Sequence, residues 1–314
     1  MTLPRIGFLG HGAIAVEHAR AFRRAGCTLA AVMGPDAEAA GKFAEEHAVG
    51  RATDSVAGIV DAEDVDAVVI ASPSGEHARQ ALAALSGGKH VLCEVPIGLS
   101  LAEVTAAAEA AGDLIAMACH TQRHFPVVSE LRARVVAGDF EPFSISTTSA
   151  IYRRSNVGWT GERRTWVDDI VWHHTTHAVD TSLRLLDDTI ESVRALAGPA
   201  DPETGRPLDL AVGLRTRTGR LATIAMSYNA MRPVSEVSVF GRSETVRISG
   251  WQPSPAAASD PNDLLGDAVF AQAQTFLRAI ADRSGSWPSF SDVLPTYRVI
   301  QQIDDQIRQE GFTA

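Results

Sequence analysis

The sequence predicts an α/β protein with two domains: a doubly wound parallel sheet, then an α+β domain with an open, mostly antiparallel sheet. Residues 4–119 alternate short apolar runs with helical patterns, which is typical of repeated βα units. A glycine-rich turn joins the first run to the first helical pattern. After Arg123 the pattern changes to short alternating runs separated by glycines. A chain of 314 residues exceeds a typical single domain, and we expect domains at residues 1–121 and 122–314.

In the first domain, apolar runs with little polar alternation predict strands whose two faces are both buried. Between them, apolar residues recur with the spacing of amphipathic helices. Repeated units of this kind give a parallel, doubly wound sheet. The expected strands are residues 5–10, 28–34, 66–73, 90–96 and 114–120, and the expected helices are residues 15–26, 36–47, 77–88 and 101–112.

In the second domain, a helix at 127–138 precedes a histidine-bearing helix that continues to about Leu186. Short alternating runs then predict an antiparallel meander. A Pro/Ala/Ser loop at 251–263 leads to helices at 264–282 and 292–309. Because an open sheet with one exposed face commonly binds a partner, we expect a homodimer or homotetramer.

The turn after the first strand carries a dinucleotide-binding fingerprint. Gly10, Gly12 and Ala15 have the G-x-G-x-x-A spacing between a strand and a helix. The first glycine permits the tight turn, the second lets a pyrophosphate approach the backbone, and Ala15 allows close packing of the helix. The helix N-terminus, at Ala13 and Ile14, presents free N–H groups to the phosphates. The first domain is therefore predicted to be a Rossmann domain that binds NADP or NAD.

The end of the second strand bears on the choice between these two cofactors. Sites that prefer NAD usually have Asp or Glu there, which accepts hydrogen bonds from the ribose hydroxyls. Here Met33, Gly34 and Pro35 occupy the place, and Asp36 lies beyond it. No carboxylate repels a 2′-phosphate, and no neighbouring Arg or Lys binds one. The sequence favours NADP, with NAD possible, and Gly34 is expected to line the site.

Two more turns follow strands in the region where the strand order of such a sheet reverses. A nicotinamide ribose could lie beside them, although each turn could equally be a loop that only joins a strand to a helix. The candidate residues are Ser72, Pro73, Ser74 and His77 after the third strand, and Glu94 and Pro96 after the fourth.

Arginines and histidines concentrate between residues 152 and 180. Guanidinium groups bind carboxylates through paired hydrogen bonds, and imidazole exchanges a proton near neutral pH. If the last part is helical, His173, His177 and Asp180 follow the i, i+4, i+7 spacing and line one face. The stretch thus indicates a site for an acidic small molecule, although solvated arginines and structural histidines are a simpler reading. The candidate substrate-binding residues are Arg123, Arg153, Arg154, Arg164, Trp166 and His174.

The composition argues against two classes of binding partner, nucleic acids and membranes. A formal net charge of −10 argues against non-specific binding to nucleic acid or to an anionic membrane, because both would be repelled. No apolar run is long enough to span a bilayer. The three cysteines have no CxxC spacing, so we expect reduced thiols and a cytoplasmic protein.

The motifs GxGxxA at 10–15, ASPSGEHA at 71–78 and EVP at 94–96, followed by a β-rich domain, resemble the glucose-fructose oxidoreductase/inositol dehydrogenase/rhizopine catabolism (Gfo/Idh/MocA) family over nearly the whole chain. The resemblance implies an NAD(P)-dependent dehydrogenase that acts on a CH–OH group. That family usually has a lysine, near the reacting hydroxyl, where this chain has Val95. It also usually has Asp-x-x-x-His on the helix that opens the second domain. Here His173 stands at the aspartate position and His177 at the histidine.

The segments HTQR (120–123), YRR (152–154), ERRTW (162–166) and WHHTTH (172–177) resemble one branch of that family. Its enzymes oxidise the cyclic hemiacetal of a protocatechuate ring-cleavage product to 2-pyrone-4,6-dicarboxylate, generally with NADP. Such a substrate needs cationic anchors, which the arginines supply. Hydride loss also requires a base for the hydroxyl proton.

We assign the role of base to His177 as a hypothesis. His173 is then hydrogen-bonded to the substrate or shares the proton, and Asp180 either fixes the imidazole tautomer or is a structural helix acid.

Three alternatives stay open. A polyol or sugar dehydrogenase of the same family would act on a neutral substrate, which leaves the clustered arginines unexplained. A non-catalytic NAD(P)-binding regulator would have the same fold. A metal site at His173 and His177, with Asp180 or His120 as a further ligand, has valid helical spacing but no recognised motif, so no metal is expected.

Overall fold

The structure is a computed structural model, and it describes residues 3–153, 169–250, 252–253 and 261–309. The chain forms two compact units. The first contains Met1–Thr121 and Leu265–Leu294, and the second contains Gln122–Leu264 and Pro295–Ala314. The chain leaves the N-terminal unit after Thr121 and returns to it at Leu265.

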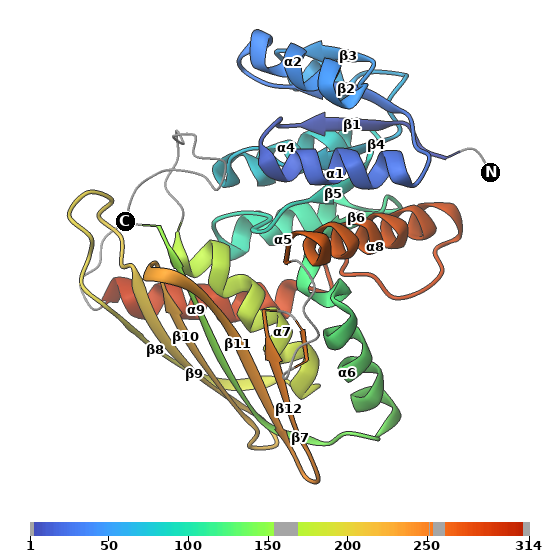
Figure 1. The fold of residues 1–314 in the computed structure, drawn as a ribbon. Helices are drawn as coiled ribbons and strands as arrows, with labels where there is room; N and C mark the ends of the chain where they lie inside the picture. The colour runs from blue at the N-terminus through green and yellow to red at the C-terminus, as the bar shows by residue number, and fades with distance from the viewer. Residues whose placement is uncertain (1–2, 154–168, 251, 254–260, 310–314) are drawn as a thin grey trace. The chain divides into compact units, whose positions relative to one another are not determined.

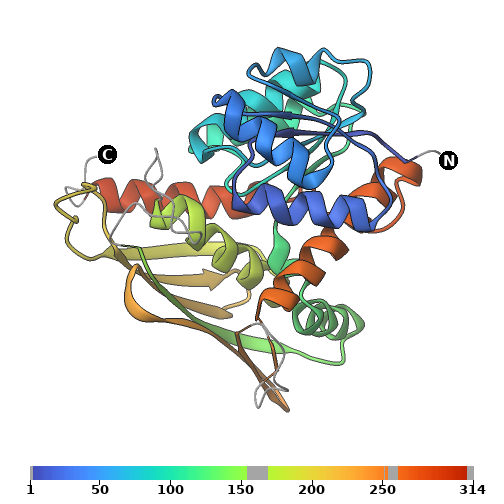
Figure 2. The same ribbon diagram turned by 45° about the horizontal axis from the view of Figure 1, so that its top comes forward.

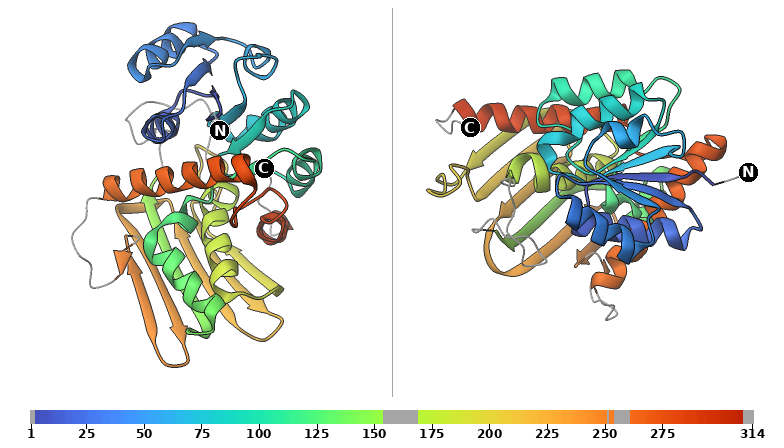
Figure 3. Two further views of the ribbon diagram at one scale, coloured as in Figure 1. Left: turned by 90° about the vertical axis from the view of Figure 1, so that its right-hand side faces the viewer. Right: turned by 90° about the horizontal axis from the view of Figure 1, so that it is seen from above.

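The first unit is built on a six-stranded sheet in the order β3-β2-β1-β4-β5-β6, in which every pair of neighbours is parallel (Figure 1). Helices cover both faces of this sheet (Figure 3). The predicted doubly wound parallel sheet is thereby confirmed. Its strands are β1 (Ile6–Leu9), β2 (Leu29–Met33), β3 (Arg51–Thr53), β4 (Ala67–Ile70), β5 (His90–Cys93) and β6 (Ala116–Ala118), and its helices are α1 (Ala13–Arg24), α2 (Ala37–His47), α3 (Ala57–Val60), α4 (His77–Ser86), α5 (Leu101–Ala110) and most of α8 (Pro261–Asp282).

The first unit recruits α8 because its apolar face completes the core over α1. Val269, Ala273 and Phe276 of α8 are fully buried in one cluster with Phe8 and Phe22. The rings of Phe22 and Phe276 meet edge to face, with centroids 6.3 Å apart. Burial of a Val or Phe side chain contributes about 1.5–3 kcal/mol. This gain explains why a segment expected in the second domain folds with the first.

The second unit is built on a seven-stranded sheet in the order β13-β12-β11-β7-β10-β9-β8. Its pairs are antiparallel except for β10 and β7, which run parallel. This agrees with the predicted open, mostly antiparallel sheet. The strands are β7 (Pro142–Tyr152), β8 (Ile190–Ala197), β9 (Asp209–Thr216), β10 (Leu221–Ser227), β11 (Asn229–Gly241), β12 (Thr245–Ser249) and β13 (Gln252–Pro253), and the helices are α6 (Pro126–Ala137), α7 (Thr176–Leu186) and α9 (Leu294–Gln309).

One face of this sheet is covered by a helix and the side chains of the other are exposed. Helix α7 packs on β7 and β10 (Figure 2), where Ile145, Thr147 and Ile224 are buried. The alternate residues of the same strands, including Thr148 and Thr223, are exposed. This is the alternation expected of a half-covered antiparallel sheet. Among the described residues, no helix has the length and apolarity needed to cross a membrane.

Candidate active site

The turn between β1 and α1 has the geometry that a pyrophosphate requires. Gly10 has φ +105°, and a Cβ there would lie 2.5 Å from the carbonyl oxygen of Ala71. Only glycine fits such a turn without strain. At Gly12 a Cβ would meet nothing within 4 Å, so the backbone is open to a ligand. Helix α1 starts there without a side-chain cap, which leaves its N–H groups, including those of Ala13 and Ile14, available for phosphate oxygens. These residues fit an NAD(P) pyrophosphate.

His77 contacts both turns that the sequence predicts beside the nicotinamide ribose, the one after β4 and the one after β5. Its ring is buried, with Nδ1 2.7 Å from the carbonyl oxygen of Pro96 and Nε2 2.7 Å from that of Ser72. The Ser72 hydroxyl donates to Oε1 of Gln80 at 2.6 Å. The structure therefore brings together residues after β4 and β5 that lie far apart in sequence. Ser74 begins a short 3₁₀ turn beside them.

A second contact at this end involves residues that the sequence did not bring together. The carboxylate of Glu94 lies 2.6 Å from Nε2 of His18, and the Cys119 thiol lies 3.9 Å from the same nitrogen. One potential metal-ligand atom from each of these three residues lies within 4.8 Å of the other two, which is close enough for all three to coordinate one ion. Burial raises the pKa of the Cys119 thiol well above its ordinary value, and the Glu94 charge acts in the same direction. The cluster is therefore held by a hydrogen bond between His18 and Glu94 while the thiol stays protonated.

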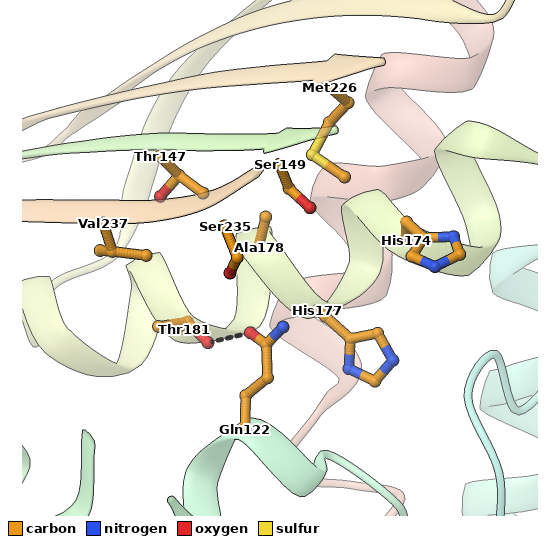
Figure 4. Close-up of a pocket in the computed structure, with 10 residues that line it drawn as sticks. All are labelled: Gln122, Thr147, Ser149, His174, His177, Ala178, Thr181, Met226, Ser235 and Val237. Carbon is orange, nitrogen blue, oxygen red and sulfur yellow. Dashed lines mark hydrogen bonds between the residues drawn. The ribbon is translucent and has the colours of Figure 1, made fainter. Parts of the chain in front are cut away.

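The second unit contains a pocket between α7 and the sheet (Figure 4). Hydroxyl groups, one amide and two imidazoles make up its polar lining. Thr181 donates to the side-chain oxygen of Gln122 at 2.8 Å. The lining residues are Gln122, Thr147, Ser149, His174, His177, Ala178, Thr181, Met226, Ser235 and Val237.

The helix that carries the histidines does not begin as an α-helix. Residues Ile170–Thr175 form a π-helix, and the α-helical pattern starts only at Thr176. Each π turn holds one more residue than an α turn, so the i, i+4, i+7 spacing assumed from the sequence does not hold across this junction. His174, rather than His173, joins His177 in the lining of the pocket.

His174 is oriented by a tyrosine that the sequence did not single out. Its Nδ1 lies 2.6 Å from the hydroxyl of Tyr228, and the two rings meet edge to face. Tyr228 is 2% exposed and lies between β10 and β11. The ring of His173 lies 4.7 Å from that of His174. No local pattern marks Tyr228, because its contact depends on how β10 packs beside the π-helix.

Asp180 and Arg123 bind each other. The guanidinium of Arg123 donates to both carboxylate oxygens of Asp180, at 2.7 and 2.5 Å, and the Thr296 hydroxyl donates to one of them at 3.1 Å. The Asp180 side chain is 1% exposed and that of Arg123 is 12% exposed. This paired geometry is the one expected of a buried structural ion pair. It favours the structural reading of Asp180 over a role at the His177 imidazole.

The remaining arginines of the predicted cluster are described only in part. Arg153 is half-buried, and its backbone N–H donates to the carbonyl of Tyr228 at 2.8 Å. Arg154, Arg164 and Trp166 lie outside the described residues. Asp169, at the start of the π-helix, accepts from the N–H groups of Val171 and Trp172 and is paired with Arg206.

Fold and fingerprint together define a dinucleotide-dependent oxidoreductase. A family described as "Oxidoreductase family, NAD-binding Rossmann fold" matches residues 4–130, and one described as "Bacterial oxidoreductases, C-terminal" matches residues 126–245. The chain belongs to the Gfo/Idh/MocA oxidoreductases, whose members are dehydrogenases that act on CH–OH groups. The predicted family and the predicted enzyme class are thereby confirmed.

Two curated relatives differ in their substrates. The chain is 26% identical to 4-carboxy-2-hydroxymuconate-6-semialdehyde dehydrogenase of Sphingobium sp. strain SYK-6, covering 98% of this chain and 100% of that protein. It is 30% identical to 1,5-anhydro-D-fructose reductase of Ensifer adhaerens, covering 69% of this chain and 67% of the relative.

Solved structures support the fold. A putative myo-inositol dehydrogenase from Sinorhizobium meliloti 1021 matches with a TM-score of 0.83 at 24% identity, over 98% of both chains. A levoglucosan dehydrogenase in complex with NADH and L-sorbose matches with a TM-score of 0.86 at 18% identity, over 99% of this chain and 98% of that one.

Proposed function

We propose that this dehydrogenase oxidises a hydroxyl or cyclic hemiacetal carbon of an acidic small molecule, with NADP as the oxidant. The specific substrate we propose is the hemiacetal of 4-carboxy-2-hydroxymuconate-6-semialdehyde, which would give 2-pyrone-4,6-dicarboxylate. The observation that carries this proposal is the near full-length relationship to the Sphingobium dehydrogenase, together with the arginine-rich stretch of residues 152–180. Carboxylates favour such guanidinium groups.

The pocket residues suit the proton-transfer half of this reaction. In the proposal His177 removes the hydroxyl proton, because imidazole is the side chain best matched to a base that works near pH 7. His174 donates a hydrogen bond to the substrate from Nε2 while its Nδ1 accepts from Tyr228. This is the role of substrate-binding residue that the sequence predicts for His174, and in the proposal it replaces the substrate contact considered for His173. When bound, the nicotinamide accepts the hydride.

The turn after β5 carries Val95 where the family usually has a lysine, so the proposed mechanism does not use a lysine. Val95 is 2% exposed and has no group that could hold or move a proton. Proton removal therefore depends on the imidazoles of the second unit in this proposal. We expect His177→Asn to lower kcat by at least about 100-fold, the usual contribution of a positioned base. NADPH affinity should change less than twofold in the variant.

A second candidate function is the oxidation of a neutral polyol or sugar. The described lining of the pocket offers four hydroxyl groups and an amide but no Arg or Lys. Such a lining suits a polyhydroxylated substrate. The curated relatives include inositol dehydrogenases, such as one of Saccharopolyspora erythraea at 28% identity over 72% of this chain and 67% of that relative.

A spectrophotometric screen separates the two candidates. Purified enzyme is given NADP or NAD with a panel of protocatechuate cleavage products, hydroxy acids, inositols and aldoses. Turnover confined to the ring-cleavage diacid supports the first proposal. Turnover of inositol or glucose without the diacid overturns it in favour of the second. Tight NADPH binding without any turnover would instead point to a regulator.

Control variants make the histidine test specific. His47→Asn replaces a histidine in the last turn of α2 and should leave kcat unchanged. His174→Asn and Tyr228→Phe should both raise KM, because one removes the proposed substrate contact and the other its orienting hydroxyl. Near-normal turnover of His177→Asn would remove that residue from the mechanism.

A further inference from the structure

The ring of His11 lies at the end of β2, where a dinucleotide site normally places the side chain that contacts the adenosine ribose. His11 is the residue between the two glycines of the fingerprint, and its ring reaches the end of β2 at Gly34. A Cβ built on Gly34 would overlap Nδ1 and Cε1 of His11. The imidazole edge therefore fills the space in which a side chain at position 34 would begin.

Position 34 is the place that distinguishes NAD from NADP in this fold. The residue about 20 positions beyond the glycines, at the end of the second strand, contacts the ribose 2′ substituent. Gly34 has no side chain for that contact. Asp36, the next acid, caps α2 by accepting from the N–H groups of Glu38 and Ala39, at 2.9 and 3.1 Å. His11 places a polar side-chain atom, Nδ1, directly against Gly34.

The state of His11 suits a ligand at this place. The ring is half-buried, and its Nδ1 has no hydrogen-bond partner among the described residues. Burial lowers the pKa of His11 below its usual value, while the negative charge of Asp36, the N-cap residue of α2, acts to raise it. In the ligand-free protein the ring therefore favours its neutral form more than a free imidazole does. A phosphate dianion brought against it would favour the protonated form.

We propose that His11, whose imidazole fills the space beside Gly34, is the residue that selects NADP, by pairing as an imidazolium with the 2′-phosphate. The inference rests on the proposed choice of NADP and gives that choice a physical basis. It also predicts that NADPH binding takes up a proton. The preference for NADPH over NADH should consequently fall as the pH rises, because NADPH binding requires a protonated ring and protonation becomes less favourable at higher pH.

Binding measurements without substrate test this inference separately from the proposed reaction. Dissociation constants for NADPH and NADH are determined by cofactor fluorescence between pH 6.5 and 8.5. For the unsubstituted protein we expect the NADPH constant to rise about tenfold over this range, which corresponds to about 1.4 kcal/mol, while the NADH constant changes less than twofold. In His11→Asn, whose amide cannot ionise, the NADPH constant should become as flat as that for NADH.

Two further variants serve as a control for the pH slope and as a test of reversed cofactor preference. His47→Asn removes another histidine of the same unit and should keep the full pH slope. In the double variant His11→Ala with Gly34→Asp, the vacated space admits a carboxylate, and the protein should prefer NADH. Gly34 does not have a positive φ, so its backbone accepts a side chain.

Two results would overturn the inference. One is a His11→Asn variant that keeps the pH slope of the NADPH constant. The other is an equal loss of affinity for both cofactors in that variant, which would mark His11 as a structural residue of the turn. Because no substrate is present, either result leaves the proposed reaction untouched, and a failed substrate screen leaves these constants valid.

Discussion

Removal of one partner of the Arg123–Asp180 pair should destabilise the second unit strongly. Both side chains are nearly inaccessible to solvent, and the carboxylate accepts three hydrogen bonds from Arg123 and Thr296. An unpaired charge left in such a place costs about 3–5 kcal/mol. We expect Asp180→Asn and Arg123→Met each to lower the free energy of unfolding by about that amount. For a unit of this size the corresponding fall in Tm is about 6–20 °C.

Urea denaturation followed by tryptophan fluorescence gives the measurement. Trp172 is buried and stacks on Tyr297 with ring centroids 6.5 Å apart, so it reports on the packing between the π-helix and α9. The matched control is Glu244→Gln. Its carboxylate pairs with Arg134 on the surface, where such pairs contribute about 0–1 kcal/mol. The double variant Arg123→Met/Asp180→Leu should recover part of the loss, because no charge is then left unpaired.

The same series decides between the two readings of Asp180. If Asp180→Asn unfolds no more easily than Glu244→Gln, the structural reasoning is refuted. If it also lowers kcat at unchanged stability, Asp180 acts on the catalytic imidazole as the alternative sequence hypothesis holds. A stability loss with kcat retained in the folded fraction supports the structural reading.

Three further changes have defined outcomes. Gly10→Ala should abolish cofactor binding, measured by NADPH fluorescence, because its Cβ would overlap the Ala71 carbonyl at a positive φ. The Cys27 thiol, whose pKa burial raises to about 11, should resist a disulfide reagent at pH 8 and react once urea unfolds the chain; its contribution to stability is present below about pH 9 and is lost as the pH rises towards 11. Thr223→Arg, on the exposed face of β10, should convert the expected homo-oligomer to a monomer in light scattering. A monomeric parent protein would contradict the last prediction.

The cofactor half of the protein could be predicted from sequence because its signals are local. The turn at Gly10 and Gly12 lies between an apolar strand and an amphipathic helix, and all three features occur within about 20 residues. The parallel, doubly wound arrangement follows from repeated βα units by the rules of chain connection. The sequence did not reveal β3 and α3, since three or four residues leave no periodic pattern, and it placed the helix at 264–282 in the second domain.

The substrate half could be predicted only in outline. Its histidines were found as a cluster, but their directions depend on the π-helix at Ile170–Thr175, and a one-residue change in turn length has no periodic signature. Tyr228 and Thr296 reach the site from distant strands and helices. Their contacts, with His174 and Asp180, are made by packing and leave no spacing in the sequence.

Each unit is built from two separate segments of the chain, and the segments of the two units alternate along the sequence. This order has a consequence for folding during synthesis. The first unit needs Leu265–Leu294 to close its core, and the second unit needs α9, whose Thr296 hydroxyl donates to the buried Asp180. Neither unit can therefore be finished on the ribosome while only its first segment has emerged. Until α8 emerges, its residues Val269, Ala273 and Phe276 cannot cover the apolar surface around Phe22. Nascent chains arrested before residue 265 should accordingly be protease-sensitive in the nucleotide-binding half.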